Sequence, residues 1–342
     1  MALQLTWFIL WSILWSLYFM LDGFVLGTGM LSGVLGRSDT EKRVLINSVG
    51  PVWSGNEVWL ITAGAATFAT FPPVYALMFS YLYTALLLIL FALIIRGVSF
   101  EFRGKVDHPS WKSAWDIAII VSSFLPALLF GVTFGNIFQG LPMDNSGYHG
   151  SLFTLFNPYG LMTGILFVLL FAVHGALYAS VKTNGELGSR ARRTANNLWN
   201  LLFIVAVAFL VYTRFATKLF DNYFKYPVLA IFPLILMMSL IAVKIFIAKG
   251  ALLKAFAFSC VAIAFEIFTG VAGLFPSLIP SRIDSAYNLT VFNSSSSPYA
   301  LKIMTVAAMI FIPIVILYQI WVYRVFHARV NRDDIVSGYE GY

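Results

Sequence analysis

This chain has 342 residues, of which 60% are hydrophobic and only 11% are charged. That composition excludes a water-soluble globular protein. A water-soluble domain has roughly a quarter charged residues. The net charge of +7 does not indicate a nucleic-acid partner either, since the charges fall in short blocks between apolar runs, as in the loops of membrane proteins. The composition therefore predicts a polytopic α-helical membrane protein that contacts membrane lipid.

Nine apolar runs follow one another along the chain, at residues 5–35, 52–70, 74–95, 114–138, 159–180, 198–212, 228–246, 252–275 and 301–322. Backbone polar groups find no water in lipid, so runs of about 20 residues must be helical. We expect an all-α membrane protein with about nine transmembrane helices in one domain, residues 1–342. Helices 1–4 (about 1–140) and helices 5–8 (about 155–276) are candidates for two four-helix bundles, with helix 9 (about 299–324) appended.

The distribution of Lys and Arg between successive loops predicts the orientation of the chain. Seventeen of these residues fall in the loops after the first, third, fifth and seventh runs and in the C-terminal tail, and five fall in the alternate loops. The third loop is expected to hold Arg96, Arg103, Lys105 and Lys112. Cytoplasmic loops carry the excess of positive charge. We therefore expect the N-terminus outside and the C-terminus in the cytoplasm, in agreement with an odd number of spans.

Four acidic residues lie in or beside the apolar runs, where an ionisable side chain is costly and is a candidate functional group: Asp22, Glu57, Asp116 and Glu266. From the helical rise, Asp116 lies near the inner mouth, Glu57 roughly 10 Å deep, or more if its helix starts earlier, and Asp22 roughly 20 Å deep. This ladder of carboxylates predicts a proton-uptake route. The alternative is that each acid is paired with a Lys, an Arg or a backbone N–H. Glu266, near mid-membrane, is either a second relay or a structural hydrogen-bond partner.

The remaining reactive residues do not form an internal cofactor site. His174 stands alone in the fifth run, and a lone histidine is more often a satisfied core residue than a ligand, so we keep it only as a secondary candidate for the proton route. The single cysteine, Cys260, excludes an internal disulfide and a cysteine-based metal site built by this chain alone. We therefore expect no catalytic residue, metal or haem on this chain by itself.

Glycines cluster in the first run, at Gly23, Gly27, Gly29 and Gly33. Small residues let membrane helices approach closely, and packing is the interpretation that we favour. The same cluster would also suit a helix that is broken around a substrate, as in secondary transporters. A proton-coupled transporter using Asp22 and Glu57 is therefore the alternative function, although helices 5–8 contain no clear counterpart of the glycine-rich segment.

Two motifs in the first part of the chain are distinctive. The first is LDGFVLGTGML, residues 21–31, and the second is RVLINSVGPVWSGNEVWLITAGA, residues 43–65. The second contains Trp-x-Gly-Asn-x-Val-Trp-Leu, a highly specific pattern, and further matches follow at residues 102–103, 111–116 and 134–140. In these motifs the chain resembles subunit II of the cytochrome bd quinol oxidases, densely over residues 1–175 and more loosely afterwards.

The resemblance implies two four-helix bundles plus one helix, and a partner of similar architecture, subunit I. In the family, subunit I carries the haems, two b-type and one d-type or b variants. The complex oxidises quinol and reduces dioxygen to water in a bacterial or archaeal cytoplasmic membrane, with protons taken from the cytoplasm. A haem-free subunit II supports the assembly and contributes proton access. A small single-helix accessory subunit is an optional further partner.

The chain departs from the family pattern at two positions, because many members have Asp where this chain has Val25 and Ser54. Ser54 is thus a candidate for the proton route by position. Glu57 stands where many members have Gln, three residues from Ser54 on the same helix face, so we expect Glu57 to compensate. Trp53, Asn56 and Trp59 of the specific motif are candidates for packing near the partner subunit or its haems. A purely structural subunit, with every acid paired, remains a third hypothesis.

Overall fold

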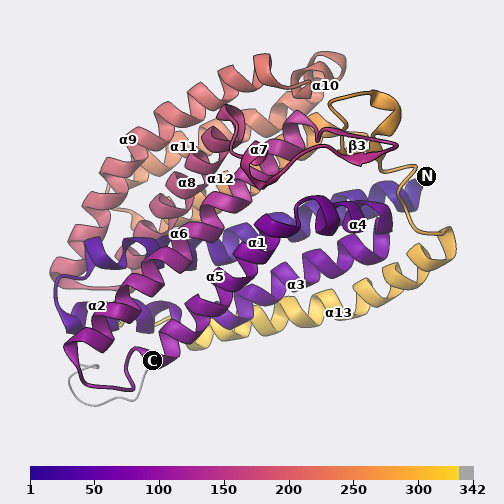
Figure 1. Ribbon diagram of the computed structural model, residues 1–342. Coiled ribbons are helices and arrows are strands. Elements are labelled where there is room, and N and C mark those ends of the chain that lie inside the picture. The colour runs from indigo at the N-terminus through magenta and orange to yellow at the C-terminus, as the bar shows by residue number, and fades with distance from the viewer. Residues whose placement is uncertain (331–342) are drawn as a thin grey trace.

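The computed structural model describes residues 1–330, and its nine longest helices run side by side (Figure 1). They are α1 (Ala2–Leu35), α3 (Trp53–Thr70), α5 (Tyr83–Phe102), α6 (Pro109–Gln139), α8 (Pro158–Lys182), α9 (Gly185–Ala216), α11 (Ile231–Ala248), α12 (Leu252–Leu274) and α13 (Pro298–Val325). Within the described residues, eight helices are long and apolar enough to cross a membrane. The ninth, α3, has 18 residues and is less apolar, because its first turns carry Ser54, Asn56 and Glu57. The prediction of an all-α membrane protein with about nine spans is confirmed, with nine as an approximate count.

Shorter elements join the long helices: α2 (Asp39–Val49), α4 (Pro72–Tyr81), α7 (Leu152–Leu155), α10 (Leu219–Lys225), η1 (Pro227–Ala230) and η2 (Ser285–Tyr287). Two small antiparallel hairpins, absent from the sequence-based prediction, pair β1 (Met143–Asp144) with β2 (Gly147–Tyr148) and β3 (Ser277–Ile279) with β4 (Leu289–Thr290). The first hairpin lies between α6 and α7, and the second lies between α12 and α13. They close one end of the bundle, where the backbone N–H of Leu141 donates to Pro280 at 2.9 Å.

Two predicted helix boundaries were wrong. The third apolar run is not one helix but α4 and α5, which meet at Leu82. Helix α9 begins at Gly185 rather than near residue 198, because the polar segment that precedes the apolar run is amphipathic. Its small apolar side chains at Leu187, Ala191 and Ala195, spaced by four residues, are buried and face the rest of the bundle.

Helix α1 is continuous and packs against α3, α6, α8 and α12. Its glycines allow two backbones to touch, because a Cβ on Gly27 would lie 1.8 Å from the carbonyl oxygen of Phe171 on α8. A Cβ on Gly175 of α8 would in turn lie 2.3 Å from the carbonyl carbon of Gly27. The glycine cluster therefore serves close helix packing, and the alternative of a helix broken around a substrate is wrong for α1.

The two ends of the bundle are distinct, and we call them the α2 end and the α10 end (Figure 1). At the α2 end, Arg190 of α9 donates to the carbonyl oxygen of Leu35 at 2.7 Å, and Lys182 donates to that of Ala328 at 2.8 Å. At the α10 end, Asn222 of α10 donates to the carbonyl oxygen of Gly273 at 3.0 Å. Helix α1 begins at the α10 end and α13 finishes at the α2 end, as an odd number of crossings requires.

Candidate functional site: a buried ion cluster

The position of Arg96 corrects the sequence-based assignment of this residue to a loop. Arg96 lies inside α5, six residues before its end at Phe102, and its side chain is fully buried. Apolar residues continue to Phe102, so the helix extends past the charge. Without Arg96, the excess of Lys and Arg in the predicted cytoplasmic segments is sixteen to five, and the predicted orientation does not change.

The guanidinium of Arg96 brings Asp22 and Glu57 together. Its Nη1 donates to Asp22 Oδ2 at 2.9 Å and its Nη2 donates to Asp22 Oδ1 at 3.1 Å, a bidentate pair. Nη2 also contacts Glu57 Oε1. The hydroxyl of Tyr18, one turn before Asp22 on α1, lies 3.5 Å from Asp22 Oδ2. The two acids therefore share one cation and are not successive steps of a ladder.

The depth inferred for Glu57 is corrected by the path of the chain between α2 and α3. Tyr178, one turn before the end of α8, donates to the carbonyl oxygen of Ser48 at 2.7 Å. The last turn of α2 thus already lies inside the α2 end of the bundle, and α3 begins deeper than the apolar run alone suggested. This is why Glu57 reaches the level of Asp22.

The charges of this cluster do not balance when every group is ionised. Two carboxylates and one guanidinium leave one negative charge, and one added proton makes the cluster neutral. Asp22 and Arg96 are fully buried, whereas 18% of the Glu57 side chain is exposed. A buried surplus charge is costly in an apolar interior. The cluster is therefore chemically suited to hold one added proton. Glu57 is the acid that contacts Arg96 through one oxygen only and that is partly exposed at the surface.

Asn56 connects the ion cluster to α13. Its Nδ2 donates to the carbonyl oxygen of Leu21 at 2.7 Å, next to Asp22. Its Oδ1 accepts from Gln319 Nε2 and from the hydroxyl of Tyr323, each at 3.0 Å. Asn56 is fully buried and all of these contacts are direct, so one side chain holds α1, α3 and α13 in register beside the cluster.

The other motif residues of α3 occupy different faces of the helix. Trp53 lies against Gly97 of α5, where an added Cβ would be 2.9 Å from its ring. Trp59 is buried in the main core, and the indole N–H groups of both tryptophans are buried without an acceptor. Ser54 is exposed on the outside of α3 and takes no part in the ion cluster.

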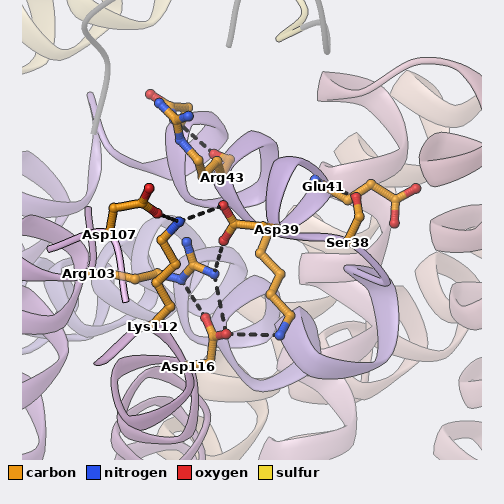
Figure 2. A network of polar contacts seen from close by, with 10 residues as sticks. Ser38, Asp39, Glu41, Arg43, Arg103, Asp107, Lys112 and Asp116 are labelled. Atoms are coloured by element: carbon orange, nitrogen blue, oxygen red, sulfur yellow. Dashed lines mark hydrogen bonds and ion pairs between the residues drawn. The ribbon is translucent and has the colours of Figure 1, made fainter. Parts of the chain in front are cut away.

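Asp116 belongs to a separate network at the α2 end, which Figure 2 shows. Its carboxylate accepts from Arg103 Nε at 2.5 Å and from Lys42 Nζ at 2.8 Å. Arg103 also contacts Asp39 at 2.8 Å, and Lys112 joins Asp39 at 3.1 Å. The structure thus places Asp116 near the end of the bundle, as expected, but pairs it with two cations and does not connect it to Glu57 or Asp22.

Electrostatics in this network favour the ionised acids. Burial on its own raises the pKa of Asp39, but hydrogen bonds from Arg103 and Lys112 outweigh it and lower the pKa overall. The same balance lowers the pKa of Glu41, which accepts from the backbone N–H of Arg37 at 2.8 Å and pairs with Arg190 at 2.6 Å. The network ties α2 to α5, α6 and α9.

The two secondary candidates differ in their surroundings. His174 on α8 is fully buried with both ring nitrogens engaged: Nδ1 lies 2.7 Å from Ser259 Oγ, and Nε2 lies 3.0 Å from the carbonyl oxygen of Met20. Its ring stacks on Phe256 with centroids 4.7 Å apart. It therefore has no free nitrogen for a haem or a metal. Glu266 on α12 is buried as well, but it forms no hydrogen bond or ion pair with any described residue.

Sequence reasoning missed the contacts that Arg96, Gln319 and Tyr323 make with the candidate site residues. The signal for Arg96 was available, because Val98, Phe100 and Phe102 continue the apolar run beyond it. A buried arginine in such a run needs acidic partners. For Gln319 and Tyr323, only their position within the last apolar run set them apart.

These features define an integral membrane protein whose helices enclose one guanidinium held by two carboxylates. The chain matches the family described as cytochrome bd terminal oxidase subunit II over residues 3–326. It is 38% identical over 334 residues to the cytochrome bd ubiquinol oxidase subunit 2 of Bacillus subtilis (strain 168), covering 97% of this chain and 98% of that protein. It is 35% identical over 366 residues to the cytochrome bd-I ubiquinol oxidase subunit 2 of Escherichia coli (strain K12), covering 98% and 97%. The chain therefore belongs to the subunit II family of cytochrome bd oxidases.

The fold agrees with this assignment. The bd oxidase from Geobacillus thermodenitrificans has a chain of the same fold, with a TM-score of 0.79 over 95% of this chain and 99% of that one, at 16% sequence identity. As a subunit II, the protein is part of a quinol oxidase complex, an oxidoreductase, and is a multi-pass membrane protein of a bacterial respiratory oxidase. The alternative of a proton-coupled secondary transporter is not supported.

Proposed function

We propose that this chain is the haem-free subunit of its oxidase, supports a haem-bearing subunit I, and helps protons reach the active centre from the cytoplasm. The observation that carries this proposal is the buried cluster in which Arg96 faces two carboxylates, Asp22 and Glu57. The cluster is one proton short of neutrality. An isolated ion pair serves structure alone, whereas a guanidinium with two carboxylates also has a place for an exchangeable proton.

In this proposal Glu57 carries the exchangeable proton, and Asp22 holds the guanidinium. Both oxygens of Asp22 are engaged by Arg96, and Tyr18 lies beside them, whereas Glu57 contacts Arg96 through Oε1. Glu57 is also the member that is partly exposed. Asp116, paired with Arg103 and Lys42, holds the α2 end together near the proton entry, and Ser54 lines the outside of α3 next to Glu57.

We place the haems, b-type and d-type or b variants, on subunit I, together with quinol oxidation and dioxygen reduction. The side chains of this chain do not fit a haem ligand set, because buried His174 has both nitrogens engaged. The other three histidines are exposed, in the connecting segments or the tail. Trp53 and Trp59 pack within this subunit, against α5 and in the main core, and in this proposal they hold α3 in place beside the partner.

The partner covers the outer face of α3 in this proposal. Ser54 and part of Glu57 are exposed there, at a depth where lipid would otherwise meet polar atoms. Polar side chains within the bilayer normally face protein or a water-filled cavity. The remaining apolar surface contacts lipid, and a small single-helix accessory subunit is an optional further partner. The α2 end faces the cytoplasm of a bacterial or archaeal cell and the N-terminus lies outside, since most Lys and Arg lie at the α2 end.

The test is the double variant Asp22→Asn with Glu57→Gln in the assembled oxidase. Each amide keeps an oxygen that accepts from Arg96, but neither binds a proton. We expect quinol-dependent oxygen consumption to slow, with haem content unchanged. Glu101→Gln is the matched control, because Glu101 lies on the same helix as Arg96, is exposed, and has no ion pair among the described residues. Unchanged turnover would refute the proton role, and loss of all haem would favour the purely structural role.

A separate experiment tests the assembly. Purified in mild detergent, this chain is expected to come with a haem-bearing partner of similar size. A chain that is isolated alone as a stable, functional unit would contradict the proposed division of labour between the subunits.

A further inference from the structure

Glu266 is an acidic side chain inside the bundle with nothing to neutralise it. It lies on α12, and the residue is 7% exposed. In the described part of the chain no Lys, Arg or His pairs with it, and no hydroxyl or N–H donates to it. This contrasts with Asp22 and Glu57, which both contact Arg96, so the two sites are chemically different.

The hydroxyl groups around Glu266 are already committed elsewhere. The phenols of Tyr159 of α8 and Tyr223 of α10 lie within electrostatic range of the carboxyl. Thr213 donates to the carbonyl oxygen of Phe209 at 2.7 Å, so the hydroxyl of Tyr159 donates to Thr213 at 2.9 Å. The hydroxyl of Tyr223 donates to the carbonyl oxygen of Thr269 at 2.5 Å. Neither phenol has a second proton to offer to a carboxylate.

All of these groups lie toward the α10 end of the bundle. Glu266 is eight residues, about 12 Å, from the end of α12 at Leu274, and 14 residues, about 21 Å, from its start at Leu252. Tyr159 is in the first turn of α8, and Thr213 is in the last turn of α9. Helix α10 lies over this end of α12, where Asn222 donates to the carbonyl oxygen of Gly273.

An ionised carboxylate in such a setting would have neither a counter-charge nor a donor. Burying an unpaired charge is far more costly than burying a neutral acid, which only has to satisfy one O–H. In the described part of the chain, the titratable groups within electrostatic range of Glu266 are the phenols of Tyr159 from α8 and Tyr223 from α10, and they carry no positive charge. The neutral acid is therefore the stable form of this side chain.

We propose that Glu266 is a second proton-binding site of this subunit, separate from the Asp22–Arg96–Glu57 cluster, and that it exchanges its proton with the aqueous face at the α10 end. It is also a site for modification by an apolar carbodiimide, which attacks neutral carboxyl groups in apolar surroundings. In that step the acid proton moves to a carbodiimide nitrogen while the carboxyl oxygen bonds to the central carbon. Acyl transfer to nitrogen then leaves a stable N-acylurea, with no oxidation or reduction.

The experiment treats the assembled oxidase in sealed, oriented membrane vesicles with dicyclohexylcarbodiimide and measures labelling of the Glu266 peptide by mass spectrometry. We expect labelling of Glu266 when the medium at the α10 face is mildly acidic. Raising the pH on that face alone should lower the labelling about tenfold for each pH unit once most of the site is ionised. The same pH change on the α2 face alone should leave the labelling unchanged.

Glu266→Gln is the control that confirms the assignment, because it removes the reactive acid and should leave the peptide unlabelled. An unlabelled Glu266 peptide in the native complex, detected by mass spectrometry in the same digest, would overturn the proposal. Labelling that follows the pH of the α2 face would overturn the assigned direction of exchange. Labelling at Glu57 reports on the ion cluster independently, so failure of one proposal does not decide the other.

Discussion

The residue with the largest expected effect on stability is Arg96, because it is fully buried and serves two acids at once. Removing one partner from a buried ion pair leaves an uncompensated charge, which costs more than the pair itself contributes. The hydrogen bonds from Arg96 to Asp22 span α5 and α1, and the contact with Glu57 adds α3. A single side chain thus links three helices in the interior.

Replacing Arg96 by Gln should destabilise the folded subunit by about 3–5 kcal/mol, since two carboxyl groups would then lack a counter-charge. The measurement is the free energy or midpoint of unfolding of the complex in detergent. The triple variant Asp22→Asn, Glu57→Gln, Arg96→Gln removes every charge and should recover much of the loss. Equal destabilisation by the single and triple variants would show that charge compensation is not the cause.

Sequence reasoning identified Asp22 and Glu57 as buried acids but could not identify their partner. Hydropathy and span length make an intramembrane carboxylate conspicuous, whereas an arginine six residues before a helix end looks like a loop charge. The pairing of residues 22, 57 and 96 depends on how three helices pack, and a single sequence does not contain that information. The exposed position of Ser54 could not be deduced for the same reason.

At the level of elements, close approach of α1 and α8 depends on glycine at positions 27 and 175. Backbone atoms occupy the space that a Cβ would need at both positions. Since backbone cannot move aside as a flexible side chain can, the helices themselves would have to separate. The small-residue motif therefore predicted the packing of α1 correctly, but not its partner helix.

Gly27→Ala should destabilise the subunit by about 1–3 kcal/mol, with the upper end expected because the clash is with backbone. Gly64→Ala is the matched control on α3, because no atom lies within 4 Å of the Cβ it would add. That change should be neutral or stabilising by up to about 1 kcal/mol. Comparing the accumulation and thermal unfolding of the two variants tests the prediction, and a similar loss in both would contradict it.

The helices that sequence reasoning located best are those whose apolar run coincides with the span, such as α8 and α12. It failed where a helix continues into polar residues, as in α9 before residue 198, because only one side of that segment meets protein. The break at Leu82 was also missed, since apolar residues continue on both sides of it. Hydropathy shows how long the apolar part of a helix is, but it does not show where the helix begins and ends.

At the scale of the whole molecule, the α2 end is held by acids and bases that lie far apart in the chain. Asp39 and Glu41 of α2 pair with Arg103 and Arg190. The pKa values of both acids are lowered from their ordinary values of 3.8 and 4.5. Acids whose pKa is lower in the folded state add stability above the unfolded-state pKa, and that stability is lost as the pH falls through the folded-state value.

We therefore expect the unfolding temperature of the complex to fall as the pH drops below about 4. Asp39→Asn should make that decline shallower, because one of the titrating contacts is absent at every pH. Glu101→Gln, which alters an exposed acid at the same end, should leave the slope as in the unmodified chain. Parallel curves for all three proteins would show that this network does not contribute to the acid response.

The overall architecture and family were predictable because they depend on composition, span number and local motifs. The division of the bundle into two four-helix groups plus one helix remains a prediction from the same pattern. The face that meets subunit I depends on which polar atoms remain exposed after the helices have packed. The face that we propose for this contact is the one where Ser54 and part of Glu57 stay exposed in the folded chain.

The attachment of α13 has a consequence for the order in which the subunit is made. Asn56 emerges early during translation, whereas Gln319 and Tyr323, which donate two of its three hydrogen bonds, emerge last. Until α13 is inserted and docked, Asn56 Oδ1 lacks these two hydrogen-bond donors within the membrane. Asn56 is adjacent in sequence to Glu57. Docking of the final helix is thus the event that completes the interior. A chain truncated before residue 298 would carry a permanent polar defect that a membrane quality-control protease can recognise.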